Sequence, residues 1–486
     1  MQVIDYITLS FLVVPLIIIV INNLFSKELS ERISLYLAGA AAIIQMASSV
    51  ADFFLLSSSH LHHYDFSLLW DLTREGSERF AVNSLSLVIL FCIGFVSFIS
   101  VLVANQTIEK KKTAYVSLLM TLILGMNGMV IVTDLFSLYV FLEIVGISSF
   151  VLVALFQTET GLEGAFKYLV MSSLASLFML TGLAFLFMQT GSLQYSLDWT
   201  RFLGARNGLS PFTYLAFILL IAGFAVKTGA VPFHSWLPDA HQSANTAVSI
   251  LLSGIVIKVA GIYGFIVLMA LFRGFPAVSA AIRILGIVSI IIGALFALRQ
   301  THFKRIVAYS SVSQMGYILL GVSTGTTLGL LGAIIHIFNH ATFKSTLFSN
   351  AAALHEQVGT LDIDAMGGLE KRMPVTGFSS VTAFLSTTGI PPLAGFWSKL
   401  FIVMALWNSG SKGFAAVALF SSILTAAYFL RLQKKVFFGK LSDRLAEVRE
   451  IGGSIKLAEI LLTIVTIAVG AGFPLVLLYL EGRGLL

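Results

Sequence analysis

Residues 222–265 read AGFAVKTGAVPFHSWLPDAHQSANTAVSILLSGIVIKVAGIYGF, and the fold is organised around this stretch. Two apolar runs flank a break rich in Gly, Pro and His, and each run carries one lysine, Lys227 before the break and Lys258 after it. Holding an ammonium group near the centre of a bilayer costs about 2.5 to 3.5 kcal/mol on insertion scales. Because the chain bears that cost twice, both lysines are candidate functional residues.

The composition indicates a polytopic membrane protein. Of the 486 residues, 57% are hydrophobic and only 11% are charged, and the mean hydropathy is +0.93. Apolar runs of about 20 residues recur, which is the length that a hydrocarbon core about 30 Å thick requires. The first run, residues 4–21, is too long for a cleaved signal peptide and lacks its basic start and small-residue cleavage site, so we expect it to be the first span.

Cutting the sequence at polar and Gly/Pro breaks predicts an all-α fold of about fourteen spans. Their centres lie near residues 14, 44, 93, 123, 145, 176, 222, 257, 288, 314, 338, 393, 421 and 468. Of the 30 Lys and Arg residues, four lie inside spans, and the loops divide the rest 18 to 8 between the two faces. The positive-inside rule then predicts a multi-pass protein of the cell inner (plasma) membrane with both termini outside.

Several classes of chemistry are excluded by what the chain lacks. Cys92 is the one cysteine, so an intrachain disulfide, a cysteine-ligated zinc site and an iron-sulfur cluster cannot form within this chain. It has no dinucleotide fingerprint and no P-loop. We therefore expect no cofactor, no metal and no catalytic redox centre here, and the net charge of +6 is a topology signal rather than a nucleic-acid patch. His60, His62 and His63 are expected in a solvated outer loop, with a metal site as the alternative.

Titratable side chains inside five of the predicted spans suit a proton wire. The set comprises Glu143, Lys227, Lys258, His336, His340, Lys344 and Lys399. A carboxylate in the middle of a span, as at Glu143, must be protonated, paired or beside water. His336, His340 and Lys344 are four residues apart, which places them on one helix face.

Alternative interpretations remain open for part of this set. Lys344 lies far enough along its span for its stem to reach an interface. His336 and His340 could be packing residues or half of a metal site, although no third ligand is evident. Glu143, Lys227 and Lys258 are too central for either explanation, and their remaining alternative is a purely structural role.

Two of the predicted spans are interrupted in the same way. Residues 228–232 (TGAVP) and 388–392 (TGIPP) match at Thr, Gly and the last Pro with an offset of 160. Helix breaks are therefore predicted at Pro232 and at Pro391 and Pro392, since proline removes a donor and a freed carbonyl inside a membrane must face protein or water. Paired interrupted spans point to an ion site in a transporter built from inverted repeats.

Six stretches carry a resemblance to a known family. They are FLEIVGISSF (141–150), FAVKTGAVPFHSWLPDAH (224–241), ALRQTHFKRIVAYSSVSQMGY (297–317), HIFNHATFKSTLF (336–348), TTGIPPLAGFWSK (387–399) and VFFGK (436–440). The chain resembles the antiporter-like membrane subunits of respiratory complex I, Mrp cation/proton antiporters and membrane-bound hydrogenases. The resemblance implies two inverted five-helix repeats, with spans 1–3 over about 4–104, spans 4–8 over about 113–271, spans 9–13 over about 277–437 and span 14 over about 457–480.

The resemblance also implies roles for the intramembrane residues. Glu143 and Lys227 correspond to the coupling ion pair of the family and Lys258 to its central proton-carrying lysine. The bridge corresponds to His336, His340 and Lys344, and the terminal exit residue to Lys399. Because Lys399 stands where the nearest complex I subunit has a glutamate, and because the chain stops at Leu486 after span 14, it looks most similar to the D-type Mrp subunit or its hydrogenase counterpart.

The expected function is a proton-translocating or cation/proton-antiporting subunit of a multisubunit complex. The expected partners are other membrane subunits, the lipid bilayer and protons, with Na⁺ as an alternative cargo, and no nucleic acid. A pumping subunit of complex I is the alternative, which would make the chain the translocating part of an oxidoreductase. An autonomous transporter and a structural scaffold are disfavoured, because the intramembrane polar groups are titratable and a scaffold has no reason to bear their cost. Residues 432–456 are expected to form a surface helix or loop, where a partner could bind.

Overall fold

The computed structural model describes residues 3–25, 27–59, 82–197, 199, 203, 210–272, 274–441 and 443–481. The predicted loop that holds His60, His62 and His63 lies outside these residues. The described elements are all helical: α1 (Val3–Leu24), α2 (Lys27–Ser59), α3 (Ser84–Thr107), α4 (Lys112–Ile131), α5 (Leu135–Ala154), α6 (Glu159–Thr190), α8 (Pro211–Thr228), α9 (Trp236–Ser243), α10 (Thr246–Leu251), η2 (Leu252–Val256), η3 (Lys258–Tyr263), α11 (Gly264–Phe272), α12 (Pro276–Arg299), α13 (Phe303–Ser323), α14 (Thr327–Val358), η4 (Ile363–Ala365), η5 (Leu369–Lys371), α15 (Pro374–Thr388), α16 (Ala394–Asn408), α17 (Lys412–Val436), η6 (Asp443–Leu445) and α18 (Gly453–Glu481).

The described helices confirm the predicted all-α polytopic fold with broken helices. Twelve helical segments of the described chain are long and apolar enough to cross a membrane. The two other predicted centres, 338 and 393, fall in α14 and between α15 and α16. Each of α15 and α16 has 15 residues, about 22 Å of helix, so neither alone matches a hydrocarbon core about 30 Å thick. The pair behaves as one span interrupted at Pro391 and Pro392.

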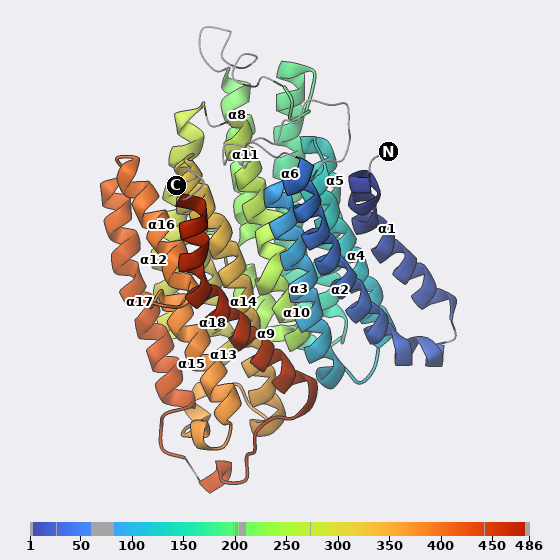
Figure 1. The fold of residues 1–486 in the computed structure, drawn as a ribbon, viewed down its shortest axis with the longest axis vertical. Coiled ribbons are helices and arrows are strands. Elements are labelled where there is room, and N and C mark those ends of the chain that lie inside the picture. Colours follow the sequence, from blue (N-terminus) through green and yellow to red (C-terminus); the bar gives the residue numbers. More distant parts are fainter. Residues whose placement is uncertain are drawn as a thin grey trace.

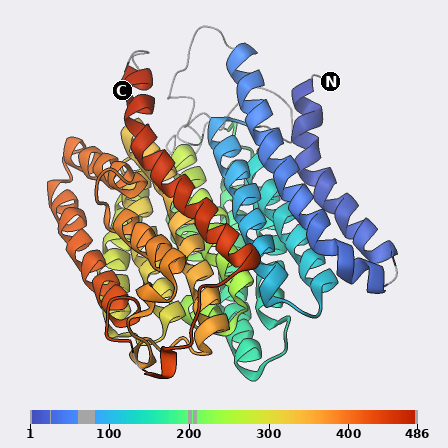
Figure 2. The same cartoon turned by 60° about the horizontal axis from the view of Figure 1, so that its bottom comes forward.

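Both described ends of the chain lie at the same end of the bundle (Figures 1 and 2). An even number of crossings produces this arrangement. The connection between α17 and α18 lies at the opposite end (Figure 1). The described residues of this connection, 437–441 and 443–452, form a loop with the short helix η6. Of the two forms expected for residues 432–456, the loop is the one observed after α17 ends at Val436.

Burial separates a central layer of helices from an outer layer. In the most apolar windows of Thr246–Phe272 and Phe303–Ser323, 94% of the residues are buried, against 33% in Glu159–Thr190 and Lys412–Val436. The outer helices expose large apolar side chains such as Phe166 and Ile423. In a bilayer these side chains face lipid tails at no cost. The central layer is therefore where titratable groups can be shielded from lipid.

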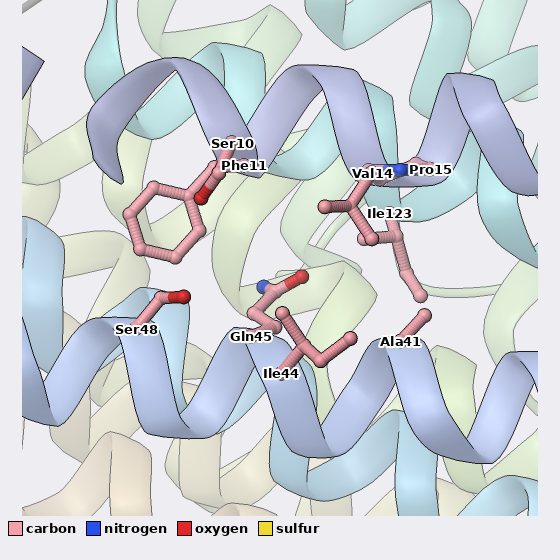
Figure 3. Close-up of a pocket in the computed structure, with 9 residues that line it drawn as sticks. All are labelled: Ser10, Phe11, Val14, Pro15, Ala41, Ile44, Gln45, Ser48 and Ile123. Atoms are coloured by element: carbon pink, nitrogen blue, oxygen red, sulfur yellow. The ribbon is translucent and has the colours of Figure 1, made fainter. Parts of the chain in front are cut away.

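The proline inside α1 shows how a freed carbonyl is satisfied inside the bundle. Pro15 cannot donate to the carbonyl of Phe11, and the side-chain amide of Asn127 donates to it instead at 2.8 Å. Asn127 also pairs with Gln45 at 2.8 Å. Figure 3 shows Gln45 pointing from α2 toward α1, into a pocket of about 10 Å³. That volume is room for about one water, so this pocket is a packing feature rather than a ligand site.

The two predicted helix breaks share one local geometry. Gly229 after α8 and Gly389 after α15 have φ of 68° and 91°, a left-handed conformation that glycine adopts without a Cβ penalty. Their N–H groups bond back to Val226 and Ser386, both at 3.0 Å. Around the breaks, α6 packs against α8 and α9 as α14 packs against α15 and α16. This parallel favours the two predicted repeats, whose boundaries stay a prediction.

Candidate functional site

The carboxylate of Glu143 and the ammonium of Lys227 lie together between α5, α6 and α8. The distance from Lys227 Nζ to Glu143 Oε1 is 3.6 Å, and the side chains are 1% and 29% exposed. Lys227 also donates to Ser172 Oγ at 2.7 Å, and Ser176 Oγ donates to Glu143 Oε1 at 2.5 Å. We call these four residues the Glu143 cluster. Opposite charges at this separation attract by about 4 kcal/mol at an effective dielectric of 20.

A glycine makes room for the ammonium in this cluster. A Cβ atom at Gly146 on α5 would lie 3.1 Å from Lys227 Nζ and 3.0 Å from Ser172 Oγ. Contacts this close force the neighbouring side chains to shift. The position of Lys227 relative to Glu143 therefore depends on the absence of a side chain at residue 146.

Lys258 lies in a helix that is wound in wide turns. Both η2 and η3 are π-helical and Lys258 begins η3. Its side chain is buried, and Nζ donates to Ser253 O at 2.6 Å and to Gly254 O. Single π turns are rare and recur at functional sites. Within the described chain no carboxylate forms an ion pair with Lys258, so backbone dipoles alone hold this ammonium.

Two serines connect Lys258 with Lys344. The hydroxyls of Ser253 and Ser311 lie 2.8 Å apart, and Ser311 donates to Val307 O at 3.2 Å. Lys344 Nζ donates to the same carbonyl at 2.7 Å. The two lysines are thus joined by hydroxyl and carbonyl groups of η2 and α13. We call these five residues the central cluster.

The alternative in which Lys344 reaches an interface is wrong. Its side chain is fully buried, donates to Ser310 Oγ, and lies 6.0 Å from the ring centre of Phe429. The helix that carries it, α14, is packed against α3, α10, α13, α15, α16 and α18. Because these helices surround α14, the stem has no path to the membrane surface.

The two histidines lie next to one another on α14, with ring centres 6.5 Å apart. His336 Nδ1 lies 2.9 Å from Ser398 Oγ, whereas neither ring nitrogen of His340 has a hydrogen-bond partner in the described part of the protein. Both side chains are fully buried. A buried polar atom without a partner is costly unless water reaches it. The described residues contain no group of three His, Cys, Asp or Glu that could hold a metal.

Lys399 lies at the second helix break. Its Nζ donates to Thr388 O, the last carbonyl of α15, at 3.3 Å, and lies 4.4 Å from the ring centre of Tyr317. That ring is also 6.1 Å from the ring of His336. An ammonium over an aromatic face is stabilised by the ring quadrupole. Tyr317 therefore contacts both His336 and Lys399. It is a neutral residue, so a search for charged residues did not find it.

The seven predicted residues thus form three groups rather than one continuous hydrogen-bonded line. No described hydrogen bond joins Lys227 to Lys258. Their helices nevertheless meet, since a Cβ at Gly261 on η3 would clash with Thr228 Oγ1 on α8. A proton passing between the groups would need water or a side-chain movement.

Several charged residues that are buried or partly exposed were missed by the sequence reasoning. Glu459 on α18 is fully buried and Lys304 on α13 is 5% exposed. Lys304 donates to Ala244 O at 2.8 Å. Asp239 on α9 pairs with Lys167 at 2.9 Å and with Arg305 at 2.7 Å. Burial raises the pKa of Asp239, but its bonds to Lys167 and Arg305 outweigh burial and hold that pKa below its ordinary value. These ion pairs fix α9 against α6 and α13.

The comparisons with known proteins show the family and the fold. Residues 132–425 match the family described as NADH:quinone oxidoreductase/Mrp antiporter, TM. The chain is 33% identical to the D-type Na⁺/H⁺ antiporter subunit of Alkalihalophilus pseudofirmus over 371 residues, which are 76% of this chain and 75% of that protein. It is 35% identical to the N-type NADH-quinone oxidoreductase subunit of Desulforudis audaxviator over 316 residues, 64% of this chain and 62% of that relative's length. A chain of the Mrp complex from Dietzia sp. DQ12-45-1b shares the fold, with a TM-score of 0.84 at 23% identity, covering 98% of this chain and 96% of that one.

Proposed function

Because the chain belongs to the NADH:quinone oxidoreductase/Mrp antiporter transmembrane family, we propose that its buried titratable residues carry protons across the membrane within a multisubunit complex. The observation that carries this proposal is the central cluster. There a buried ammonium, Lys258, bonds in the described chain only to carbonyl groups. The hydroxyls of Ser253 and Ser311 and the carbonyl of Val307 lie between it and a second buried ammonium, Lys344. A buried ammonium without a carboxylate partner holds its proton less firmly than a paired one, whereas a structural charge would be paired.

The Glu143 cluster supports a role as the switch that drives the central cluster. Closing the pair lowers the energy of the charged Lys227 by about 4 kcal/mol, and separating it removes that stabilisation. A movement of Glu143 on α5 would thereby change how firmly Lys227 holds its proton. The end of α8 packs on η3 at Gly261. A change in the charge of Lys227 therefore occurs close to the helix that carries Lys258.

We assign the chain to an Mrp-type antiporter or to the Mrp-like module of a membrane-bound hydrogenase, with a complex I subunit as the alternative. Lys399 at the second break favours the first assignment, while the relatives of both kinds are similarly distant, 33% and 35% identical. Purifying the native complex and identifying the subunits that accompany the chain tests this assignment. Small Mrp subunits would support it, and quinone-reductase subunits would replace it with the alternative.

A topology prediction follows from the loop charges. Reporter domains fused after Lys112 and Lys440 are expected on the cytoplasmic side, and those fused after Arg79 and Arg206 on the outer side, because 18 of the 26 loop Lys and Arg residues gather on the first face. An alkaline phosphatase and fluorescent-protein pair reports each side. Fusions at Arg79 and Lys112 on one face would contradict fourteen spans with both termini outside.

A second prediction concerns the glycine that seats Lys227. Gly146→Ala is expected to reduce transport severalfold while the complex assembles normally, since alanine stabilises a helix by about 0.5 to 1 kcal/mol yet crowds Lys227 Nζ. Gly413→Ala on α17 is the matched control, because nothing lies within 4 Å of its added Cβ. Proton-gradient formation in inverted vesicles is the measurement. Equal rates in the two variants would show that Lys227 does not need this position.

A further inference from the structure

A buried carboxyl group lies outside the predicted wire, at the start of α18. Glu459 is fully buried and bonds to two helices. Its Oε1 accepts from Asn350 Nδ2 of α14 at 2.6 Å, and its Oε2 lies 3.0 Å from Thr376 Oγ1 of α15. Thr376 Oγ1 also lies 2.9 Å from Oε1 of a second carboxyl group, Glu450.

The hydrogen bonds around Thr376 are satisfied best with one extra proton. A threonine hydroxyl has a single hydrogen to donate, yet Thr376 Oγ1 touches two carboxyl groups that would both be acceptors if ionised. Glu450 is the ionised one, because its oxygens accept from the backbone N–H groups of Val375 at 2.6 Å and Ile451 at 3.1 Å and it sits at the N-terminus of α15, which favours negative charge. Placing the proton on Glu459 lets its Oε2–H donate to Thr376, whose own hydroxyl then donates to Glu450.

Unpartnered polar atoms continue from Glu459 toward Lys258. In the described chain Asn350 Oδ1, Ser349 Oγ and Ser345 Oγ are buried without a hydrogen-bond partner. Ser345 lies one helical turn before Ser349 on the same face of α14. Its Oγ is 3.1 Å from a Cβ built on Gly254, the residue whose carbonyl binds Lys258. Buried polar atoms of this kind are normally satisfied by ordered water.

We propose that Glu459 is a proton-binding site that exchanges protons between Glu450, in the partly exposed loop before α18, and Lys258. The proton moves from Glu459 to Thr376 as the hydroxyl proton of Thr376 moves to Glu450, so no atom is gained or lost. On the other side, Asn350, Ser349 and Ser345 with intervening water connect Glu459 to the central cluster. This inference rests on the proposed function, because it supplies protons to the same lysines.

The test compares Glu459→Gln, Lys258→Ala and the exposed control Glu447→Gln in the whole complex. Glutamine reproduces both hydrogen bonds of a neutral carboxyl group, since its oxygen accepts from Asn350 and its NH₂ donates to Thr376, but it carries no exchangeable acid proton. Proton transport by Glu459→Gln is expected to fall by about tenfold or more, since a positioned proton donor contributes about 10²–10⁴-fold to a rate. The infrared C=O band of a protonated carboxyl group should also disappear from the purified variant, while Glu447→Gln changes neither.

Two results would overturn the inference. One is a normal transport rate in Glu459→Gln, which a purely structural role predicts. The other is an infrared difference spectrum without a protonated-carboxyl band. The Lys258→Ala variant distinguishes a failure of the Glu459 inference from a failure of the proposed function. If Lys258→Ala is inactive and Glu459→Gln is normal, only Glu459 loses its role, whereas normal transport by both would contradict the proposed function itself.

Discussion

Lys258→Ala is expected to abolish proton transport while the complex still assembles in normal amounts. The side chain is fully enclosed and its ammonium bonds only to Ser253 O and Gly254 O, so no other described residue can take over its proton-carrying position. Removing a buried charge relieves about 2.5 to 3.5 kcal/mol of insertion cost. The loss of activity should therefore not reflect a loss of stability.

Two further variants guard this prediction. Lys258→Met keeps most of the aliphatic volume and is expected to be equally inactive, which rules out a packing defect as the cause. Lys110→Ala removes an exposed loop lysine and should transport at the normal rate. Membranes that hold normal amounts of the Lys258→Met complex and transport normally would show that Lys258 carries nothing.

Lys344→Ala is expected to be as severe as Lys258→Ala. A lysine that reached an interface would be dispensable, but Lys344 is fully buried and shares Val307 O with Ser311. Assembly measured by the amount of complex in membranes, and transport measured in vesicles, give the comparison. If Lys344→Ala kept most of the transport rate while Lys258→Ala abolished it, Lys344 would not be part of the proton path.

Glu143→Gln is expected to lose most coupled transport, and Glu143→Asp to keep a measurable part. Glutamine has nearly the same volume and still accepts from Ser176, but it cannot attract Lys227 across 3.6 Å. The loss of about 4 kcal/mol of attraction leaves a buried ammonium without its counter-charge. Aspartate keeps the charge at a longer distance, which weakens the attraction without removing it.

The measurement for this pair is the initial rate of proton or sodium gradient formation in inverted vesicles at matched protein level. Glu109→Gln, on an exposed loop residue, is the control for loss of one negative charge near the membrane. A normal rate of gradient formation in Glu143→Gln would show that the Glu143–Lys227 pair is not the switch.

The sequence allowed the buried charged residues of the candidate site to be located, because a charge inside an apolar run is visible in the sequence alone. All seven predicted residues lie in the described helices, and Lys227, Lys258, Lys344 and Lys399 are each buried there. The sequence could not show which side of a helix is covered by neighbouring helices. That is why an interfacial Lys344 stayed open, although six helices surround α14.

The neutral members of the site could not be predicted for a different physical reason. Ser253, Ser310 and Tyr317 are ordinary residues of transmembrane helices, and only their contacts with Lys258, Lys344 and Lys399 give them a role. The π turns of η2 and η3 likewise carry no proline or other sequence signal. Glu459 was passed over because it lies three residues from Lys456, in what looked like the polar start of the last span.

The central claim is that Lys258 releases and regains a proton, rather than acting as a fixed charge. Lys258→Arg tests it most directly, because arginine keeps the positive charge and the donors for Ser253 O and Gly254 O but is not deprotonated in proteins. The measurement is the initial rate of proton-gradient formation by the assembled complex in inverted vesicles. The account predicts a rate no higher than that of Lys258→Ala, whereas a rate equal to that of the unmodified complex would contradict it.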